Sequence, residues 1–490
     1  MTVNSFHFPS SSKFGSPRKR FLISGAVISL LSLIFAGNSY AQSMYDVSLV
    51  EQRQERLINP VYVVTNGIDS SLPDTQFLEV LAGDTWGYMR DIVDRETGLP
   101  LDNIIMVSTS PVQINDYTSI TNIGLYLMCV TGADSMGLIG RDDAVARIRL
   151  VIDSLNKMDT WQGQFYNYYK TDDLTHSGHY VSTVDLGWLS AGILVVKNAF
   201  PSEAGDDAQK LLDQIDFNKF YDTQLGHLAL GYDTQAEKMS PYHYGLLCTE
   251  PRVASYLAIA KGDVPETHWL RLYRTLPRSW NWQKQIPLGK SRRYRKYGVF
   301  NGYYVHNNFR YVPSWGGSMF EFLMPTLVLK EQELAHAGLG ANNKAVVGAQ
   351  IAYALEEAGY PAWGISPCST PSDPQGYREY GVAFLGSRGY DDKGVIAPYA
   401  SILALDIEPH KTLENLRKLS AYTDIYGPYG FFDSINILTG QVNTKYLCLD
   451  QAMSFLALAN YLTGGSIREW FHSDPIIKEY EYLLTDERFF

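Results

Sequence analysis

Six stretches of the chain are almost free of charge and have the composition of helices that are buried on all sides. Four of them carry one carboxylate at or near their start: Asp185, Glu250, Glu321 or Asp450. An unpaired charge in a protein interior costs several kcal/mol, so acids kept in such helices point to chemistry. The six stretches cover residues 118–130, 182–196, 249–260, 317–329, 395–405 and 446–462.

An amphipathic, charged stretch follows each apolar one. These stretches cover residues 141–158, 206–215, 266–276, 343–359, 410–422 and 474–484. Six buried helices alternating with six half-exposed helices predict an all-α fold, an (α/α)6 toroid with the apolar set inside. The inner helices of such a toroid run parallel, so the acids at their starts are expected to meet at one end.

Long loops enter that same end and are rich in Tyr, Trp, Gly and Pro, a composition typical of binding loops around a cleft. They cover residues 161–180, 310–318, 363–381 and 426–441. Residues 290–312 alternate as strands do, which predicts a small β-hairpin at the cleft.

The N-terminus has the features of a secretory signal peptide. Three basic residues precede the apolar run 21–36, and Ser39-Tyr40-Ala41 fits a cleavage site after Ala41. The run is short for a membrane anchor, and the mature chain shows no later span. We expect a signal peptide at 1–41, a polar segment at 42–74 and a catalytic domain at 75–490 whose first helix covers 75–93, with the protein in the periplasm or secreted.

Composition excludes several classes of function. The net charge of −11 disfavours nucleic acid and anionic membranes as partners. Four scattered cysteines do not form a zinc motif, although they permit one disulfide. The histidines share no ligand spacing, so no metal and no cofactor is expected. The sequence has no phosphate-binding loop, no H-E-x-x-H and no G-x-S-x-G motif.

Hydrolysis of a glycosidic bond commonly uses one protonated carboxyl group and one carboxylate. Glu250 is the leading general acid, although a helix start lowers a carboxyl pKa, so that burial or a second carboxylate has to raise it again. Asp433, expected on a loop over the cleft, is the candidate base, and Asp185 a third carboxylate. Each also has a structural interpretation. Glu250 could be a helix-start charge paired with Arg252, Asp433 an ordinary turn aspartate and Asp185 a helix cap.

Aromatic residues make up 13% of the chain, with 34 tyrosines, as is common where sugars stack on rings, although a large helical core also uses aromatics. Asp450 and Glu321 are expected to have mainly structural roles. The expected substrate-binding residues are Arg252, Trp161, Tyr180, Trp315, Trp363, Tyr429, Asp450 and Gln451.

From about residue 84 to residue 487 the chain resembles the glucoamylase-like domain of cyclic β-1,2-glucan synthases and, more distantly, endo-β-1,2-glucanases. It is most similar to uncharacterised secreted members of that group. The motifs that carry the resemblance occur in the same order, and include GQFYNYYKTDDL, YVSTVDLGWL, EPRVASYLAIAKGDVPETHW, SWGGSMFEFLMP, WGIS and YGPYGFFDS.

The resemblance implies an (α/α)6 barrel that acts on a β-glucan or a related polysaccharide, with Glu250 in the place of the endoglucanase acid. The synthases carry a Glu after W-G-I-S, where Pro367 and Cys368 stand here. They also have Glu at Asp433, and His-His-Gln in place of Leu449-Asp450-Gln451. These differences favour a hydrolase over the transferring machinery of the synthases.

The sequence therefore predicts a secreted or periplasmic, endo-acting glycoside hydrolase on an oligo- or polysaccharide. The main alternative is a glycan-binding protein that has lost catalysis and associates with polysaccharide synthesis or export machinery. A polysaccharide lyase on a similar toroid is a third reading.

Overall fold

The computed structural model describes residues 47–61, 64, 67–107, 110–422 and 424–490. The signal peptide expected at 1–41 lies outside these residues. The segment expected as polar, 42–74, contains helix α2 (Val47–Arg56). Within the described residues, no helix is both long enough and apolar enough to cross a membrane.

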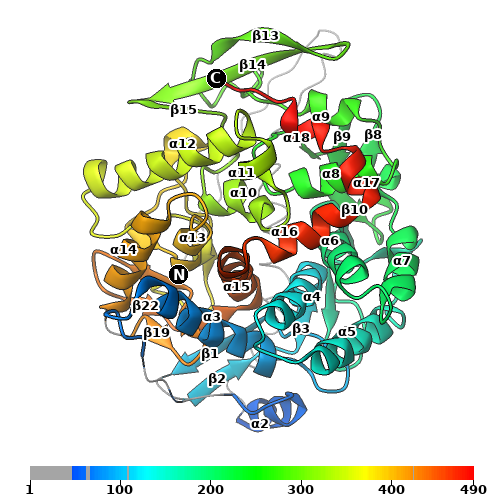
Figure 1. The fold of residues 1–490 in the computed structure, drawn as a ribbon, viewed down its shortest axis with the longest axis vertical. Helices are drawn as coiled ribbons and strands as arrows, with labels where there is room; N and C mark the ends of the chain where they lie inside the picture. The colour runs from blue at the N-terminus through cyan, green and yellow to red at the C-terminus, as the bar shows by residue number, and fades with distance from the viewer. Residues whose placement is uncertain (1–46, 62–63, 65–66, 108–109, 423) are drawn as a thin grey trace, which may run out of the picture.

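All six apolar stretches contain helices. They are α4 (Ile120–Ser135), α6 (Thr183–Ala199), α8 (Arg252–Ala260), α10 (Met319–Leu323) with the 3-10 turn η2 (Met324–Leu327), α13 (Pro398–Ile402) and α15 (Cys448–Thr463). Contacts run from α4 to α6 to α8, and from α10 to α13 to α15 and back to α4. The Arg252 side chain joins α8 to α10 through the carbonyls of Glu321 and Phe322. In Figure 1 these helices surround the middle of the molecule.

Each of these helices packs against a second, more exposed helix that follows it in the chain. Such helices bury one face only; α7, for example, buries Ala208, Leu211 and Leu212. The second set comprises α5 (Arg141–Leu155), α7 (Gly205–Gln214), α9 (Thr267–Arg271), α12 (Leu339–Ala352), α14 (Pro409–Ser420) and α16 (Ser466–Ser473), while α3 (Asp74–Asp91) packs on α15.

The sixth outer helix differs from the prediction. The expected helix over 474–484 is broken into α17 (Pro475–Glu479) and α18 (Tyr482–Thr485), and α16 takes the place beside α15. Asp474 caps α17 at Pro475, but that helix ends at Glu479, the Tyr480 N–H donates to the Ile477 carbonyl at 3.1 Å in a tighter turn, and α18 starts only after Glu481. Two short elements, α11 (Glu331–Leu334) and the π-helical turn η3 (Tyr353–Glu357), flank α12.

Glycines let the apolar helices approach closely. A Cβ atom on Gly124 of α4 would lie 2.3 Å from the Trp188 carbonyl oxygen of α6, and one on Gly192 would lie 2.1 Å from the Gly124 carbonyl oxygen. No larger residue fits at either position without separating the two helices.

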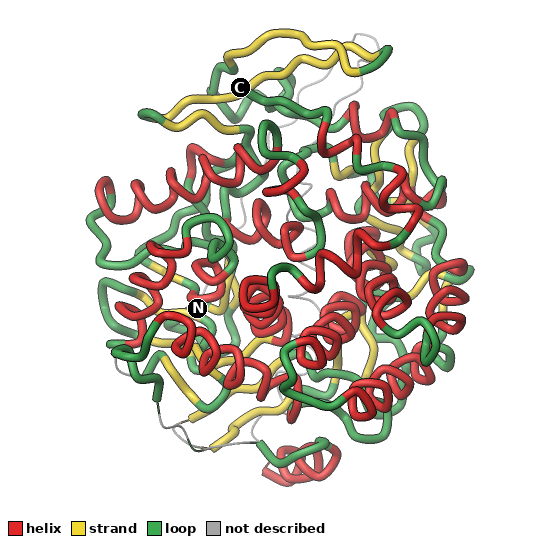
Figure 2. Tube along the Cα trace, viewed as in Figure 1, coloured by secondary structure: helices red, strands yellow, loops and turns green. Residues whose placement is uncertain are grey.

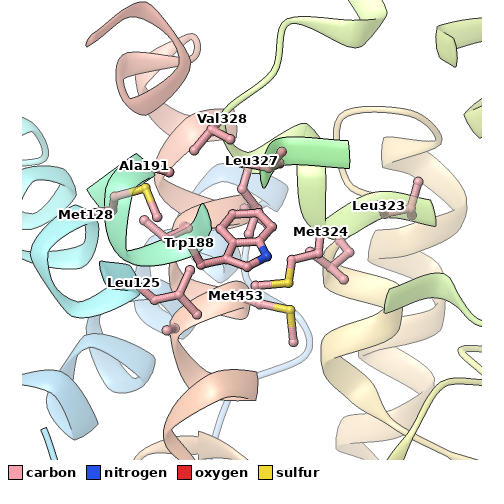
Figure 3. Close-up of a cluster of buried hydrophobic side chains, with 14 of the residues drawn as sticks. Leu125, Met128, Trp188, Ala191, Leu323, Met324, Leu327, Val328 and Met453 are labelled. Carbon is pink, nitrogen blue, oxygen red and sulfur yellow. The ribbon is translucent and has the colours of Figure 1, made fainter. Parts of the chain in front are cut away.

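Apolar side chains fill the space between the six helices. Figure 3 shows Trp188 of α6 beside Leu125 of α4, Met453 of α15 and Met324 of η2. All four are buried. These apolar contacts pack α4, α6, α15 and η2 against one another.

The strands are short and lie mainly in the loops between helices (Figure 2). Antiparallel sheets of two or three strands organise the long loops that the sequence assigned to binding. The strands outside the largest sheet are β1 (Asn103–Val107), β2 (Ser110–Ile114), β3 (Tyr117–Ser119), β4 (Thr160–Trp161), β5 (Gln164–Phe165), β6 (Tyr168–Lys170), β7 (Tyr180–Ser182), β8 (Tyr221–Asp222), β9 (His227–Ala229), β10 (Gly231–Asp233), β11 (Lys238–Met239), β12 (His243–Tyr244), β16 (Cys368–Ser369), β17 (Tyr377–Arg378), β18 (Val395–Ile396), β19 (Tyr426–Gly427), β20 (Gly430–Phe431), β21 (Ser434–Asn436), β22 (Val442–Asn443) and β23 (Lys445–Leu447).

The predicted hairpin exists as β13 (Leu288–Tyr294) and β14 (Tyr297–His306), extended by β15 (Phe309–Tyr311). β14 packs on α9 and β15 on α12, both outer helices, and the position at the cleft stays a prediction. Figure 1 shows the sheet at the edge of the molecule.

Candidate functional site

The acids occupy equivalent positions at the starts of the apolar helices. Asp185, Glu321 and Asp450 are each the third residue of their helix, in α6, α10 and α15. Glu250 lies in the turn two residues before α8. Negative charge is favoured at a helix start, and Glu321 uses this position directly by accepting from the Ser318 N–H.

Glu321 is held by a dense set of donors. Its carboxylate accepts hydrogen bonds from the backbone N–H of Gly316 at 2.8 Å and of Ser318 at 3.1 Å. The hydroxyl groups of Ser314 and Ser318 donate to it at 2.9 and 3.0 Å. With Ser318 it forms a capping box on α10. Burial raises the pKa of Glu321, but these donors favour its charged form and oppose that shift.

Glu250 has the opposite environment. Burial, and next the negative charge of Glu321, raise the pKa of Glu250 to about 8, with Asp185 adding to the shift in the same direction. Its own backbone hydrogen bond and the charge of Arg252 lower it. The second carboxylate that acid duty requires is therefore present, and it is Glu321.

The pair can thus divide one negative charge unequally. Glu321 has the donors that stabilise a carboxylate, whereas Glu250 is half-buried beside that charge and, with a pKa of about 8, keeps its proton at neutral pH. Two carboxyl groups whose surroundings separate their pKa values are a common arrangement for an acid at an enzyme site.

Asp185 lies beside this pair and is held by α4 and the preceding loops. Its carboxylate accepts from the Thr121 hydroxyl at 2.6 Å and, with the Asn167 amide turned so that its nitrogen faces the carboxylate, from that nitrogen at 3.0 Å. Burial raises the pKa of Asp185, against these hydrogen bonds. The ring of Tyr180 lies close enough for Asp185 to raise the pKa of that phenol further, after burial.

The sequence predicted that Asp433 lies on a loop over the cleft, but its side chain is not exposed there. It is 3% exposed, between β20 and β21, and its carboxylate accepts from the Ser369 backbone N–H at 2.5 Å. β20 and β21 belong to separate small sheets, and between them the Asp433 N–H donates to the Lys445 carbonyl at 3.1 Å, which ties residue 433 to β23.

Asp433 is paired with Asp450. Burial and then the charge of the neighbouring Asp433 raise the pKa of Asp450 well above its ordinary value. Neither oxygen of Asp450, nor Oδ1 of Asp433, has a hydrogen-bond donor among the described residues. Because Asp450 lacks a donor such as Ser369 and lies beside a second carboxyl group, burial and that neighbour favour its protonated form.

A small cavity adjoins this pair, with room for about one water molecule. Gln451 lies on its wall and donates from its amide nitrogen to the Phe431 carbonyl at 3.0 Å. Lys445, also buried, lies near Asp433; burial lowers the pKa of Lys445, and the neighbouring carboxylates act against that shift.

Arg252 is not available to a substrate. Its side chain is fully buried and makes two hydrogen bonds to Glu331, at 2.7 and 2.9 Å. The prediction of a substrate contact is therefore wrong, and so is the pairing with Glu250, because Glu331 is the ion-pair partner.

The predicted aromatic platforms separate into two groups. Trp363 is 2% exposed and Tyr429 is fully buried, so neither ring offers a face to a sugar and these two predictions are wrong. Trp161, Tyr180 and Trp315 are half-buried. Trp161 stacks on Tyr232 at 4.2 Å, Tyr180 lies beside Asp185, and Trp315 precedes the Gly316 that binds Glu321.

Sequence reasoning missed Glu379, Tyr377 and Tyr390, which lie between the two carboxyl pairs. The pKa of Glu379 is raised by burial and by Glu321, and its carboxylate is hydrogen-bonded to Tyr390. The pKa of Tyr377 is raised by burial and then by Asp450, Asp433 and Glu379. The high Tyr content of residues 363–381 was the available signal, but it did not distinguish these residues from their neighbours.

The described residues contain no group of three or more His, Cys, Asp or Glu side chains that could hold a metal ion. The four cysteines are buried and free, so the disulfide left open by the sequence does not form. The histidines are dispersed: His243 pairs with Asp222 and His306 with Glu357.

Comparison with known proteins matches two parts of the chain to family models. Residues 80–243 match a family of unknown function, DUF3131. Residues 287–475 match the family described as "Putative glucoamylase". This glucoamylase-like segment contains Glu321, Asp433 and Asp450, whereas Glu250 lies between the two matches.

The chain is similar in sequence to the cyclic β-(1,2)-glucan synthase NdvB of Rhizobium meliloti, with 26% identity. The alignment covers 83% of this chain but only 18% of that protein. In fold it is similar to the endo-β-1,2-glucanase of Chitinophaga pinensis, solved with sophorotriose and glucose, with a TM-score of 0.67, 16% identity and coverage of 85% and 98% of the two chains. The endo-β-1,2-glucanase of Talaromyces funiculosus, solved with sophorose, is similar with a TM-score of 0.64 and 11% identity, and the match covers 84% of this chain and 90% of that one. The glucoamylase-like fold expected from the sequence is therefore confirmed.

Proposed function

We propose that this protein is a glycoside hydrolase in which Glu250 is the general acid. The observation that carries this proposal is the Glu250–Glu321 pair, because a carboxyl group that keeps its proton at neutral pH is what departure of a sugar oxygen requires. Glu321 acts through Glu250 and is a positioning residue.

The six apolar helices form the inner ring of an (α/α)6 toroid in this proposal, with their starts at the substrate end. The ring of helix contacts and the pairing of each apolar helix with an outer helix support this architecture. It gives Asp185, Glu250, Glu321 and Asp450 a common end and a common face toward substrate.

Asp433 is the proposed base, and Asp450 its protonated neighbour. An ionised Asp433 can accept a proton from water, and Asp450, by donating to it, fixes its orientation. The substitutions that separate this chain from the glucan synthases support a hydrolase. The substituted residues also lie together, since Cys368 is close enough to Asp433 and Asp450 for their charges to raise the Cys368 pKa, after burial. Three departures from the synthase pattern thus fall in one cluster.

The proposed substrate is a β-glucan or a related polysaccharide, attacked internally outside the cytoplasm. Similarity to two endo-β-1,2-glucanases and to a β-1,2-glucan synthase supports the linkage, and the signal-peptide pattern supports export. Association with polysaccharide synthesis or export machinery is part of the same proposal.

The test is hydrolysis of linear and cyclic β-1,2-glucan, measured as new reducing ends, by the wild type and by Glu250→Gln. We expect cleavage by the wild type and a loss of at least about 100-fold in the variant. Binding without new reducing ends would instead favour the inactive glycan-binding alternative, and products with an absorbing double bond would indicate a lyase.

A further inference from the structure

Three tryptophans form a cluster on the segment between α9 and β13 and on the loop before α10. Trp280 and Trp282 stack with ring centroids 5.1 Å apart and planes at 21°. Trp280 meets Trp315 edge-on at 5.4 Å and 84°. All three are half-buried, unlike Trp188, Trp269 and Trp363, which lie in the core.

This cluster is continuous with the carboxyl site. The Trp315 indole N–H donates to the Tyr390 hydroxyl at 3.1 Å, and Tyr390 is hydrogen-bonded to Glu379. Glu379 in turn lies near Glu321, whose charge raises the Glu379 pKa after burial does so. A path of hydrogen-bonding and aromatic groups therefore leads from the Glu250–Glu321 pair to Trp280.

The tryptophan segment is also anchored. The Gln285 amide donates to the Gly386 carbonyl at 2.8 Å, and the Tyr311 hydroxyl donates to the Gln285 amide oxygen at 3.2 Å. Half-exposed rings held in place are preorganised for binding, because little side-chain freedom is lost when a ligand arrives. The neighbouring polar groups, Tyr390 and Glu379, suit the hydroxyl groups at the edge of a sugar ring.

We propose that Trp280, Trp282 and Trp315 form a subsite that binds additional sugar units of a neutral glucan chain, beyond those at the carboxyl groups. The inference rests on the proposed function for its catalytic meaning, but binding can be measured without catalysis. Such a subsite favours long substrates over short ones and explains an endo-acting enzyme.

The experiment compares wild type with Trp282→Ala and Trp280→Ala, using affinity electrophoresis in gels that contain linear β-1,2-glucan and kinetics on polymer and on the shortest cleaved oligosaccharide. Trp470→Ala is the matched control. Trp470 is 36% exposed and lies beyond the carboxyl end of α15, a helix of 16 residues or about 24 Å, whereas Asp450 lies near its start.

We expect each cluster variant to bind polymer about tenfold more weakly, as for the loss of one stacking partner, while the control binds as the wild type does. KM should rise more for polymer than for the short substrate. Circular dichroism and thermal unfolding establish that each variant folds, and the Trp→Phe variants, which keep a ring, should recover part of the affinity.

Equal polymer affinity in wild type and both alanine variants would overturn the inference, and so would a wild type that binds no neutral glucan. Failure of the proposed function has a different signature: the wild type would bind polymer through these residues and release no reducing ends.

Discussion

Replacing Glu321 by Gln tests the pairing of acids at the start of α8 and α10. The substitution removes the negative charge next to Glu250 and leaves an amide oxygen that can still accept from Ser318. If Glu321 raises the Glu250 pKa by its charge, Glu250 should lose its proton at lower pH in the variant.

The size of the effect follows from the structure. Two charges several Å apart at intermediate permittivity interact by on the order of 2 kcal/mol, and about 1.4 kcal/mol corresponds to one pH unit. Burial, the larger cause of the pKa of about 8, is unchanged. We therefore expect the alkaline limb of kcat/KM to move from near pH 8 in the wild type to about one to two pH units lower in Glu321→Gln.

The assay is the pH dependence of reducing-end release from β-1,2-glucan between pH 4 and 10. The capping box is weakened in the variant, at a cost of about 1 kcal/mol, so thermal unfolding at each pH separates loss of fold from loss of protonated acid. Ser318→Ala, which weakens the same cap but keeps the Glu321 charge, is the control. An unchanged alkaline limb in Glu321→Gln, or an equal displacement in Ser318→Ala, would refute the reasoning.

Three further results are expected. The Glu250 pKa is raised on folding from its ordinary 4.5 to about 8, so protonated Glu250 favours the folded state below pH 4.5 and this contribution is lost as pH rises toward 8. Glu250→Gln should remove this decline in stability, measured by denaturant unfolding over a pH series. An identical decline in the variant would contradict the assignment. Asp433→Asn should lower kcat by about 100-fold or more, whereas Asp450→Asn, whose amide can still donate to Asp433, should lose far less; equal losses would count against Asp433 as the base. Arg252→Met should cost about 3 to 5 kcal/mol of unfolding free energy, because Glu331 is left as a buried unpaired charge, and a variant of normal stability with a raised KM would restore the substrate-binding role.

The helical part of the fold was predictable because its signals are local. Apolar runs without charge, followed by amphipathic runs, specify which helices are buried, and the S-x-x-E pattern of Ser318 and Glu321 is itself a helix-start signal. The exception is the stretch 474–484, whose pattern looks continuous in sequence but is interrupted by a turn at Tyr480 and Glu481.

The candidate site was less predictable because its decisive contacts join residues far apart in the sequence. Glu250 was predicted to be the acid and Glu321 to have a structural role, and only the fold brings the two together. Arg252 looked like the natural neighbour of Glu250, yet Glu331 from α11 takes it. Burial of Trp363 and Tyr429 likewise depends on packing between elements, which residue type alone does not reveal.

The most direct test of the account is the activity of Glu250→Gln beside the wild type on linear β-1,2-glucan, followed as new reducing ends at pH 6. The account predicts hydrolysis by the wild type and a loss of at least about 100-fold in a variant that folds and binds the glucan normally. A folded Glu250→Gln protein that hydrolyses at the wild-type rate would contradict it.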